Sequence, residues 1–379
     1  MSAAPAPREA RRAEALESFR VRGMPHRRFE HWRYSDLRAV LDAGQVAQAG
    51  TARWQVQRVP DGIELFDLSK PVGPDWVLRH LGNVGNRPTM EEASLAFADG
   101  GAALRVARGT RVAEPVRLQI SGTGNLRLLL VLEEDSSLAL METHAVDAGL
   151  LRNVGVEIAL GPGAVLSQVR CAPPAPRSFT VEHIAVAAAG RARYRAHFAN
   201  FGARLSRTEL HIVLQGEASE AHLSGVTVLG GEYHADVTTH IEHAAGRTLS
   251  TQLFKHVAGG KSRAVYQGRI TVREGANGSD SRQTAKALIT SPRAEADMKP
   301  ELVIFADDVK CAHGAAAGDF DPDSLFYLRS RGISEREARR LLIHAFLEEA
   351  IAAVEDGALR EYVWRDVESA LPRAMEAAK

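Results

Sequence analysis

The sequence predicts a mainly β protein whose β core is flanked by helical regions toward the amino and carboxy termini. Between about residues 101 and 310, short apolar runs recur between Gly or polar residues, and many alternate with period two. Clear hairpin signals are scarce in this stretch, because only Ala276-Asn277-Gly278 offers an Asn-Gly turn. Many short strands without matching hairpin turns favour a coil of stacked rungs, such as a β-helix or solenoid, over a meander.

The apolar runs of the core predict the individual strands. Leu210, Ile212 and Leu214 alternate with the polar residues Glu209 and His211, as in a strand with one buried face. Comparable strands lie twenty-odd residues apart in several places, which is compatible with the turns of a solenoid. The predicted strands are Val116–Ile120, Leu126–Leu132, Val154–Leu160, Val165–Val169, Val181–Val186, Leu210–Leu214, Gly225–Leu229, Val237–Ile241 and Ala264–Val272.

The amino-terminal region is predicted to be helical and mixed. Charged residues with scattered apolar ones at roughly helical spacing predict helices over 8–22 and 30–43, and Gly23-Met24-Pro25 separates them. A segment of about 50–100 with four prolines follows and has no single periodicity.

The carboxy-terminal region predicts three helices. Asp321 is an N-cap candidate followed by Pro322 at the first helical position, which predicts a helix ending near Gly332. Ser334 and Glu337 have the spacing of a capping box, and a helix with a wide apolar stripe follows them.

A further helix is predicted over about 358–377, with Pro372 as a kink or break. We therefore divide the chain into an amino-terminal helical and mixed region (1–100), a β core (101–315) and a carboxy-terminal helical domain (316–379). The length of 379 residues exceeds that of a usual single core, which agrees with several structural regions.

Composition excludes several classes of function. Forty-seven basic residues face 47 acidic ones, so the net charge gives no reason to expect nucleic acid or an anionic membrane as the main partner. The amino terminus lacks the apolar segment of a secretory signal, and no run approaches the ~20 apolar residues that cross a bilayer. Cys171 and Cys311 are the only cysteines, which excludes a disulfide framework and favours a reducing compartment. We expect a soluble, cytoplasmic protein.

The sequence lacks the motifs of self-sufficient enzymes. There is no G-x-S-x-G, no G-x-x-x-x-G-K-[ST] and no G-x-G-x-x-G opening a helix after a strand. The stretch 259–262, Gly-Gly-Lys-Ser, lacks the upstream glycine of a phosphate loop and predicts a β-turn. A β-helix carbohydrate-active enzyme would need paired acids in an aromatic-lined groove, whereas aromatic residues make up only 6% and no such pair stands out.

Cys311 and His313 are the candidate metal ligands. They are two residues apart, so on extended backbone their side chains would point the same way, about 6–7 Å apart at Cα. A thiolate and an imidazole can share one borderline metal such as ferrous iron or zinc. Since a stable site usually needs three or four ligands, the others must come from elsewhere in the fold or from a second chain. The alternative is a buried thiol beside a hydrogen-bonded imidazole.

The remaining histidines and Cys171 are interpreted as structural. His240 and His243 would face opposite sides of a strand, so the group that they form with their neighbours predicts polar strand-surface residues. Those neighbours are His234, Glu232, Asp236 and Glu242. Four further histidines are interpreted as solvated positions on strands, namely His183, His197, His211 and His222. Cys171 is predicted to be a packed thiol beside a turn.

Four blocks of residues, in order, resemble one known family. They are Gln283–Leu288, Ala294–Leu302, Phe305–Ala315 and Leu325–Ile333. In these blocks the chain resembles the SufB/SufD family of iron–sulfur cluster assembly scaffold proteins. The segment Glu30–Leu37 is similar to the E-x-W-[KR]-Y-[ST]-D-L pattern of the SufD branch, and the region lacks the cysteine cluster that many SufB proteins carry.

The resemblance implies a right-handed parallel β-helix and a non-ATPase scaffold without a catalytic motif of its own. It implies pairing with a SufB paralogue and docking of the SufC ATPase on the carboxy-terminal domain, with Leu341, Leu342, Ala345 and Phe346 as docking candidates. We expect no tightly bound cofactor on the isolated chain, only transient iron or an iron–sulfur cluster in the complex. An exposed β-helix edge is also compatible with a homodimer of the isolated chain.

The resemblance also implies roles for the candidate ligands. His313 matches the family's SufD histidine at the SufB interface, where the nascent cluster is thought to be built, and Cys311 matches its companion cysteine. The alternative is a purely structural adaptor with all cluster chemistry on SufB. Ala312, Ala316 and Asp319 depart from the family's usual residues, which removes two hydroxyl groups near the site and leaves the two candidate ligands intact.

Overall fold

The computed structural model describes residues 7–48, 50–85, 88–98, 100–145 and 150–376. The helices are α1 (Pro7–Arg22), the single 3-10 turns η1 (Glu30–Trp32) and η2 (Leu37–Ala39), α2 (Ala43–Ala47), α3 (Asp75–His80), α4 (Thr89–Phe97), α5 (Pro322–Ser330), α6 (Glu335–Ile351) and α7 (Gly357–Ala374). The strands are β1 (Arg53–Val56), β2 (Ile63–Asp67), β3 (Gly101–Val106), β4 (Val116–Ser121), β5 (Gly124–Leu132), β6 (Ser137–His144), β7 (Leu151–Leu160), β8 (Val165–Ala172), β9 (Ala175–Ala188), β10 (Arg193–Asn200), β11 (Ala203–Leu214), β12 (Glu220–Leu229), β13 (His234–His243), β14 (Leu249–Ala258), β15 (Arg263–Val272), β16 (Ser279–Ile289), β17 (Glu295–Ile304) and β18 (Val309–Gly318).

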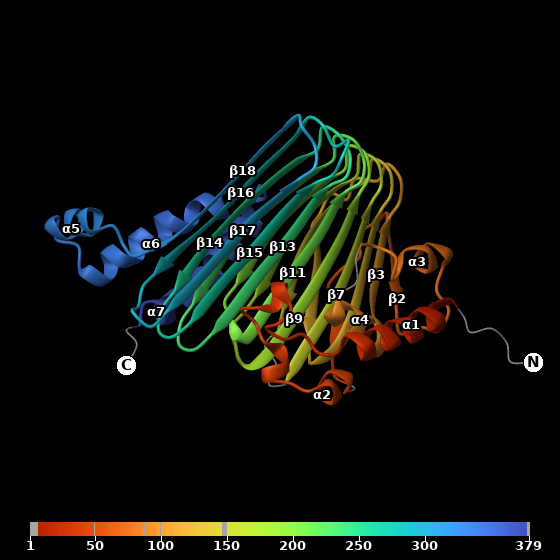
Figure 1. The fold of residues 1–379 in the computed structure, drawn as a ribbon, viewed down its shortest axis with the longest axis horizontal. Helices are drawn as coiled ribbons and strands as arrows, with labels where there is room; N and C mark the ends of the chain where they lie inside the picture. Colours follow the sequence, from red (N-terminus) through yellow and green to blue (C-terminus); the bar gives the residue numbers. More distant parts are fainter. Residues whose placement is uncertain (1–6, 49, 86–87, 99, 146–149, 377–379) are drawn as a thin grey trace, which may run out of the picture.

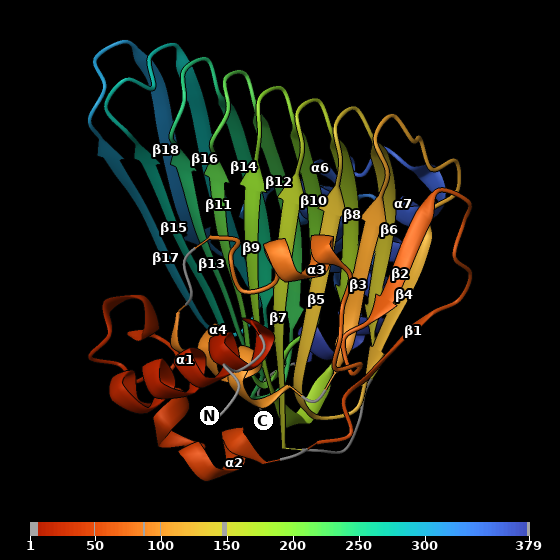
Figure 2. The ribbon, with the colours of Figure 1, turned by 90° about the vertical axis from the view of Figure 1, so that its right-hand side faces the viewer.

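The strands form a parallel β-solenoid of about eight turns (Figure 1). Sheet A has the order β1-β4-β6-β8-β10-β12-β14-β16-β18, and sheet B has the order β17-β15-β13-β11-β9-β7-β5-β3-β2. Neighbouring strands are parallel except at the start of the coil, where β1 pairs antiparallel with β4 and β2 with β3. Figure 2 shows the successive rungs lying side by side. The predicted parallel β-helix is confirmed, and every predicted strand lies within an observed one.

Period-two alternation places one face of each strand inside the coil, between the two sheets. In β11, Leu210, Ile212 and Leu214 are buried in the central apolar cluster. Val186 and Ile241 flank Ile212 on the neighbouring rungs, in parallel register. Burying one such side chain contributes about 1.5–3 kcal/mol, so the stacked columns hold the rungs together.

The helical regions cover opposite outer faces of the coil (Figures 1 and 2). The amino-terminal region packs on sheet B through a cluster that includes Trp32, Leu37 and Phe179. Helices α6 and α7 pack on sheet A through a second cluster that includes Ile343 and Val363.

Buried polar contacts of two arginine side chains fix the amino-terminal region to sheet B. Arg127 of β5 lies between Glu91 of α4 and Glu157 of β7, and all three side chains are buried. Farther along, Arg207 of β11 also stacks on the ring of Trp32, with 4.2 Å between the guanidinium carbon and the ring centroid. Removing one partner of a buried pair leaves an uncompensated charge and costs about 3–5 kcal/mol.

The helix predicted over 30–43 is wrong. The chain forms only the turns η1 and η2 there, and α2 begins at Ala43. The side chain of Asp36 accepts a hydrogen bond from the Ala39 N–H and caps η2. The apolar residues that suggested a helical stripe, Trp32 and Leu37 among them, instead pack on sheet B. Tertiary packing therefore explains their spacing.

The predicted starts of α5 and α6 are confirmed. Asp321 accepts from the N–H of Ser324 at 3.0 Å, and Ser334 Oγ accepts from the N–H of Glu337 at 3.3 Å. The second half of the expected capping box is replaced, because the Glu337 carboxylate accepts from Arg340 instead.

The end of the chain departs slightly from expectation. Pro372 lies inside α7, which continues to Ala374, and residue 377, the predicted end, lies outside the described residues. Strand β18 runs to Gly318, past residue 315, where we expected the β core to end. β1 is an edge strand of sheet A and β2 an edge strand of sheet B, although both precede residue 101. The stretch 259–262 forms a turn between β14 and β15, as predicted. Among the described residues, no helix has the length and apolar character that crossing a bilayer requires.

Glu91 gives a test of the buried ion network through pH. Burial raises the pKa of Glu91 to about 8, from an ordinary 4.5. Between these values the folded protein holds a proton that the unfolded chain has released, so stability falls as pH rises from about 5 to about 8. The decline is at most ~1.4 kcal/mol per pH unit for this one proton. We expect Glu91→Gln to remove most of this decline, measured as the urea midpoint of unfolding at several pH values.

The matched control is Glu301→Gln, at a partly exposed carboxylate that pairs with Arg269 and Lys299. This control should keep the wild-type pH slope. Equal slopes in the wild type and the Glu91→Gln protein would contradict the proton assigned to Glu91.

Candidate functional site at the last rung

The coil ends on β17 and β18, the last strands of sheets B and A. β18 pairs in parallel with β16, and no described strand pairs with its other edge. Most residues of β18 are exposed, in contrast to the largely buried strands in the middle of the coil, such as β13. An open strand edge presents a row of backbone N–H and C=O groups that can pair with another chain.

Cys311 and His313 lie on this edge strand. Cys311 is opposite Ser281 and His313 is opposite Gln283 in the parallel register with β16. Because the Ser281 and Gln283 side chains are buried, this is the face of the strand that points into the coil. Cys311 packs against a small apolar cluster that includes Ile270, whereas His313 is exposed. The predicted pair therefore shares one face, at the open end of the interior.

Gln283 is a polar group directly below His313 in the coil. Its Nε2 donates to the Tyr266 hydroxyl at 2.8 Å. Gly268 makes room for it, because a Cβ there would lie 1.4 Å from Nε2. The Oε1 of Gln283 is buried and has no hydrogen-bond partner within the described part of the chain. A buried acceptor without a partner is uncommon, and this one lies one rung from the His313 imidazole.

The electrostatic surroundings keep Cys311 protonated. Partial burial raises the pKa of the Cys311 thiol, and the carboxylate of Asp280 raises it further. The thiol is therefore not a reactive thiolate by itself near neutral pH. A bound metal ion would supply the positive charge that favours loss of this proton.

The described residues hold two groups of three potential metal ligands. These groups are His211 with His240 and Glu242, and Glu142 with His144 and Glu182. Neither group includes Cys311 or His313. The last rung therefore brings together two candidate ligands from this chain.

The contacts of the other histidines on β13 agree in part with the sequence analysis. His240 and His243 face opposite sides of β13, as predicted: the His243 ring contacts two hydroxyl groups inside the coil. His234 lies 3.0 Å from Ser35 Oγ. The sequence analysis missed the pairing of His240 with His211, which lie opposite each other in register with ring centroids 4.9 Å apart. The sequence separation of the two histidines equals one full turn of the coil, but this separation indicates a pair only when the register of the strands is known.

Three histidines interpreted as solvated are buried, namely His183, His197 and His211. The helical regions cover the outer faces of both sheets, where these histidines lie. Burial lowers the pKa of His197 to about 3, and its Nδ1 lies 2.8 Å from Ser224 Oγ. Cys171 is buried between sheet A and α7, where desolvation raises its pKa. This burial agrees with the structural interpretation of Cys171.

The predicted docking residues on α6 divide between two environments. Leu341 and Ala345 are exposed. Leu342 and Phe346 are half-buried and pack against the cluster between α6 and sheet A. Lys255 of β14 lies 4.7 Å from the centroid of the Phe346 ring and holds that side chain against the coil.

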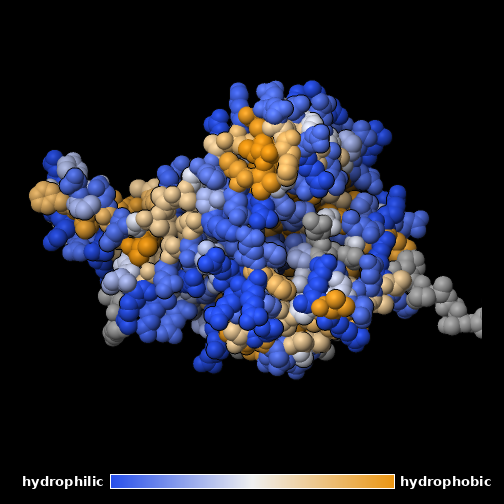
Figure 3. Space-filling view, viewed as in Figure 1, coloured by the Kyte–Doolittle hydropathy of each residue, from blue (hydrophilic) through white to orange (hydrophobic). Residues whose placement is uncertain are grey.

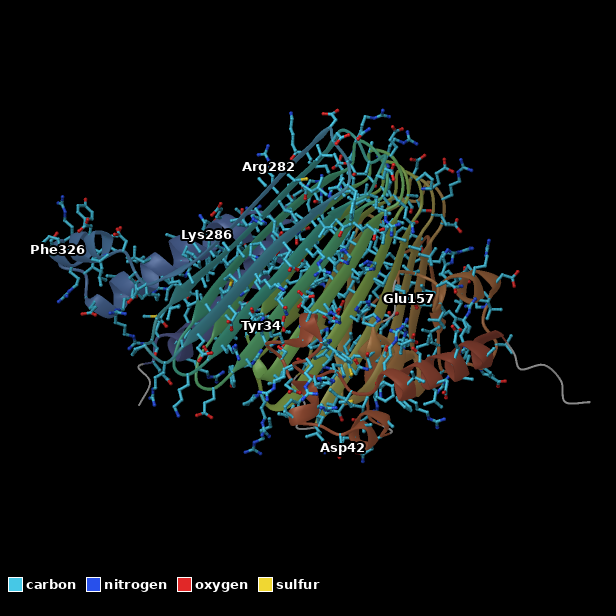
Figure 4. The ribbon with its side chains drawn as sticks, in the orientation of Figure 1. Tyr34, Asp42, Glu157, Arg282, Lys286 and Phe326 are labelled. Atoms are coloured by element: carbon cyan, nitrogen blue, oxygen red, sulfur yellow. The ribbon has the colours of Figure 1, made fainter. Side chains whose placement is uncertain are left out.

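The sequence analysis did not single out the exposed aromatic residues of α5. Phe326 and Tyr327 are 74% and 57% exposed. Figure 4 shows Phe326 at the tip of the projecting helix, away from the coil. Figure 3 shows apolar colour at the same tip, on an otherwise largely hydrophilic projection. Exposed aromatic side chains of this kind are typical of protein–protein contacts.

Comparisons with known proteins agree with the resemblance. Residues 119–346 match the family model described as SUF system FeS cluster assembly, SufBD core domain. The chain is 29% identical to the iron–sulfur cluster assembly protein SufD of Escherichia coli (strain K12) over 92% of this chain and 90% of that protein. It is 28% identical to a SufBD family protein of Mycobacterium tuberculosis over 95% and 93% of the two chains. It is also 33% identical to a SufBD family protein of Synechocystis sp., where the match covers 62% of this chain and only 55% of the relative.

The solenoid and the family match together define the class of the protein: it is an iron–sulfur cluster assembly protein of the SUF system. More than half of its length matches the core model. The chain belongs to the SufB/SufD family, and its similarity to Escherichia coli SufD along nearly the whole of both chains supports the SufD branch.

The two cysteines give a test of the site's accessibility. We expect one thiol per native chain, Cys311, to react with a maleimide, because Cys171 is buried. The rate should rise with pH beyond neutrality, since the pKa of Cys311 is raised. Mass spectrometry of the labelled peptides would identify the thiol. Cys311→Ala should abolish native labelling, and labelling of Cys171 at a similar rate in folded protein would contradict this assignment.

Proposed function

We propose that this protein is a non-ATPase scaffold subunit of a cytoplasmic SUF complex, in which Cys311 and His313 contribute two ligands to an iron or nascent cluster site shared with a SufB paralogue. The observation that carries the proposal is the position of both side chains on β18, the strand with the open edge. Iron and the cluster are cargo in this proposal, and the remaining ligands come from the partner.

The open edge supports pairing with a second solenoid. The backbone groups of β18 have pairing partners on β16 alone among the described strands. A strand from a partner chain would satisfy the free edge and would place its side chains beside Cys311 and His313. The same edge would also allow a homodimer of the isolated chain in the absence of the partner.

The chemistry of the pair suits transient metal binding. Because the pKa of Cys311 is raised, a bound cation would favour loss of its proton, so iron binding and thiol deprotonation are coupled. Gln283 Oε1 is suited to accept a hydrogen bond from an imidazole N–H of His313, which would leave the other ring nitrogen as the metal ligand. Two ligands hold a metal weakly. A site completed by two chains can therefore open when the chains move.

Helices α5 and α6 supply the surface proposed for a SufC-type ATPase. Phe326, Tyr327 and Leu341 are exposed there. Leu342 and Phe346 contribute less directly, since they pack toward the coil. ATP binding would act through differential affinity for two arrangements of the helical domains.

A purely structural adaptor is the second candidate, because the open edge can pair with a partner whatever side chains it carries. In the reconstituted three-protein complex, we expect His313→Ala to lower bound iron and cluster yield about tenfold or more, while the complex remains intact by size-exclusion chromatography. His222→Ala, a substitution of a partly buried histidine on β12, should match the wild type.

The two candidates predict different failures. If His313→Ala disrupts the complex, the adaptor is supported. If cluster formation and assembly are both unchanged, His313 is not a ligand.

The docking proposal is tested by replacing the α5 aromatics. We expect Phe326→Asp/Tyr327→Asp to weaken binding of the isolated ATPase about tenfold or more, because exposed aromatics commonly dominate such contacts. Calorimetric titration would measure the change. Val72→Asp, at an 80% exposed apolar residue in the amino-terminal region, is the control for loss of surface hydrophobicity. If Phe326→Asp/Tyr327→Asp and Val72→Asp bind the ATPase with equal affinity, docking on α5 is contradicted.

A further inference from the structure

We propose that His211, His240 and Glu242 form a separate binding site for one divalent transition metal ion, of the zinc or ferrous iron class, on the outer face of sheet B. Two imidazoles and one carboxylate are a donor set that such ions commonly use, with open positions for water or a further ligand. The site does not depend on the function proposed for the last rung.

The parallel register brings the three donors together. His211 of β11 lies opposite His240 of β13, and Glu242 follows two residues later on the same face. One potential ligand atom from each residue lies within 4.8 Å of the others. Metal–ligand bonds of about 2.0–2.2 Å place ligand atoms ~3.3 Å apart in a tetrahedral site. A metal ion at this site would require small side-chain rotations that bring the donor atoms closer together.

Neighbouring residues already orient two of the donors. His240 Nε2 lies 3.0 Å from Thr271 Oγ1. Donation from Nε2–H to this oxygen leaves the lone pair of Nδ1 for a metal, which is the usual arrangement around metal-binding histidines. Glu242 Oε1 accepts from Arg273 at 2.8 Å, and the second oxygen of the same carboxylate can bind the ion.

A cavity gives the site access and room for additional ligands. His211 and His240 line a cavity of about 650 Å³ between the amino-terminal segment and sheet B. His31, Glu209 and Gln267 also line it and offer further polar contacts.

The other three-ligand group lacks these features. Glu142, His144 and Glu182 are all buried, and the guanidinium of Arg170 contacts both carboxylates. A permanent cation therefore already occupies the position that a metal would need. The contrast favours the group beside the cavity.

The test uses the full chain with the last-rung ligands removed, as Cys311→Ala/His313→Ala, so that its outcome is independent of the proposed function. We expect this protein to bind one equivalent of Zn²⁺ in calorimetric titration. Co²⁺, used as a spectroscopic probe, should give the visible absorption bands of a bound ion. In this background, His240→Gln and Glu242→Gln should each weaken Zn²⁺ binding at least tenfold.

Two further variants keep the test decisive. Thr271→Val should weaken binding about tenfold while leaving all three donors in place, as expected for loss of an orienting hydrogen bond. His222→Gln is the matched control, since His222 lies on sheet A with hydroxyl and carboxylate contacts of its own. The proposal is overturned if the background protein binds no Zn²⁺. It is equally overturned if His240→Gln and His222→Gln have the same effect.

Discussion

Parallel backbone pairing between successive rungs is the interaction on which the rest of this molecule depends. Each strand pairs with the rung before it and the rung after it, and the register aligns Val186, Ile212 and Ile241 into one buried column. Because every rung supplies the edge for the next, the coil is continuous until the chain leaves it. Its last strand in sheet A, β18, then keeps an edge that no described strand fills. The continuity that stabilises the coil thus also exposes its end.

The helical regions protect the faces of the coil and leave that end available. The amino-terminal region is held on sheet B by buried charges such as Arg127, and α6 and α7 cover sheet A through apolar packing. Each cover packs over histidines that lie on the outer faces, which explains why His183 and His197 are buried. Within the described part of the chain, only the last rung combines an open backbone edge with a thiol and an imidazole directed toward the interior.

The sequence predicted features that depend on neighbouring residues and missed features that depend on residues far apart in the chain. Period two is a property of neighbouring residues, so the strands and the shared face of Cys311 and His313 were predicted correctly. Register is a long-range property, and the pairing of His211 with His240 was therefore missed. The spacing around Trp32 suggested a helix because packing on another element produces similar apolar periodicity. The resemblance of the 283–333 blocks, rather than composition, carried the identification.

The two metal sites proposed here differ in completeness, and the difference follows from position. His211, His240 and Glu242 lie in the middle of the coil, where neighbouring rungs of one chain supply three donors. Cys311 and His313 lie where the next rung is missing, so further donors must come from outside sheet A of this chain. A three-donor site can retain an ion in the isolated protein, whereas a two-donor site holds one only while a partner is present. On the proposed function, a cluster assembled at the second kind of site would be released when the partner withdraws, as delivery to a recipient protein requires.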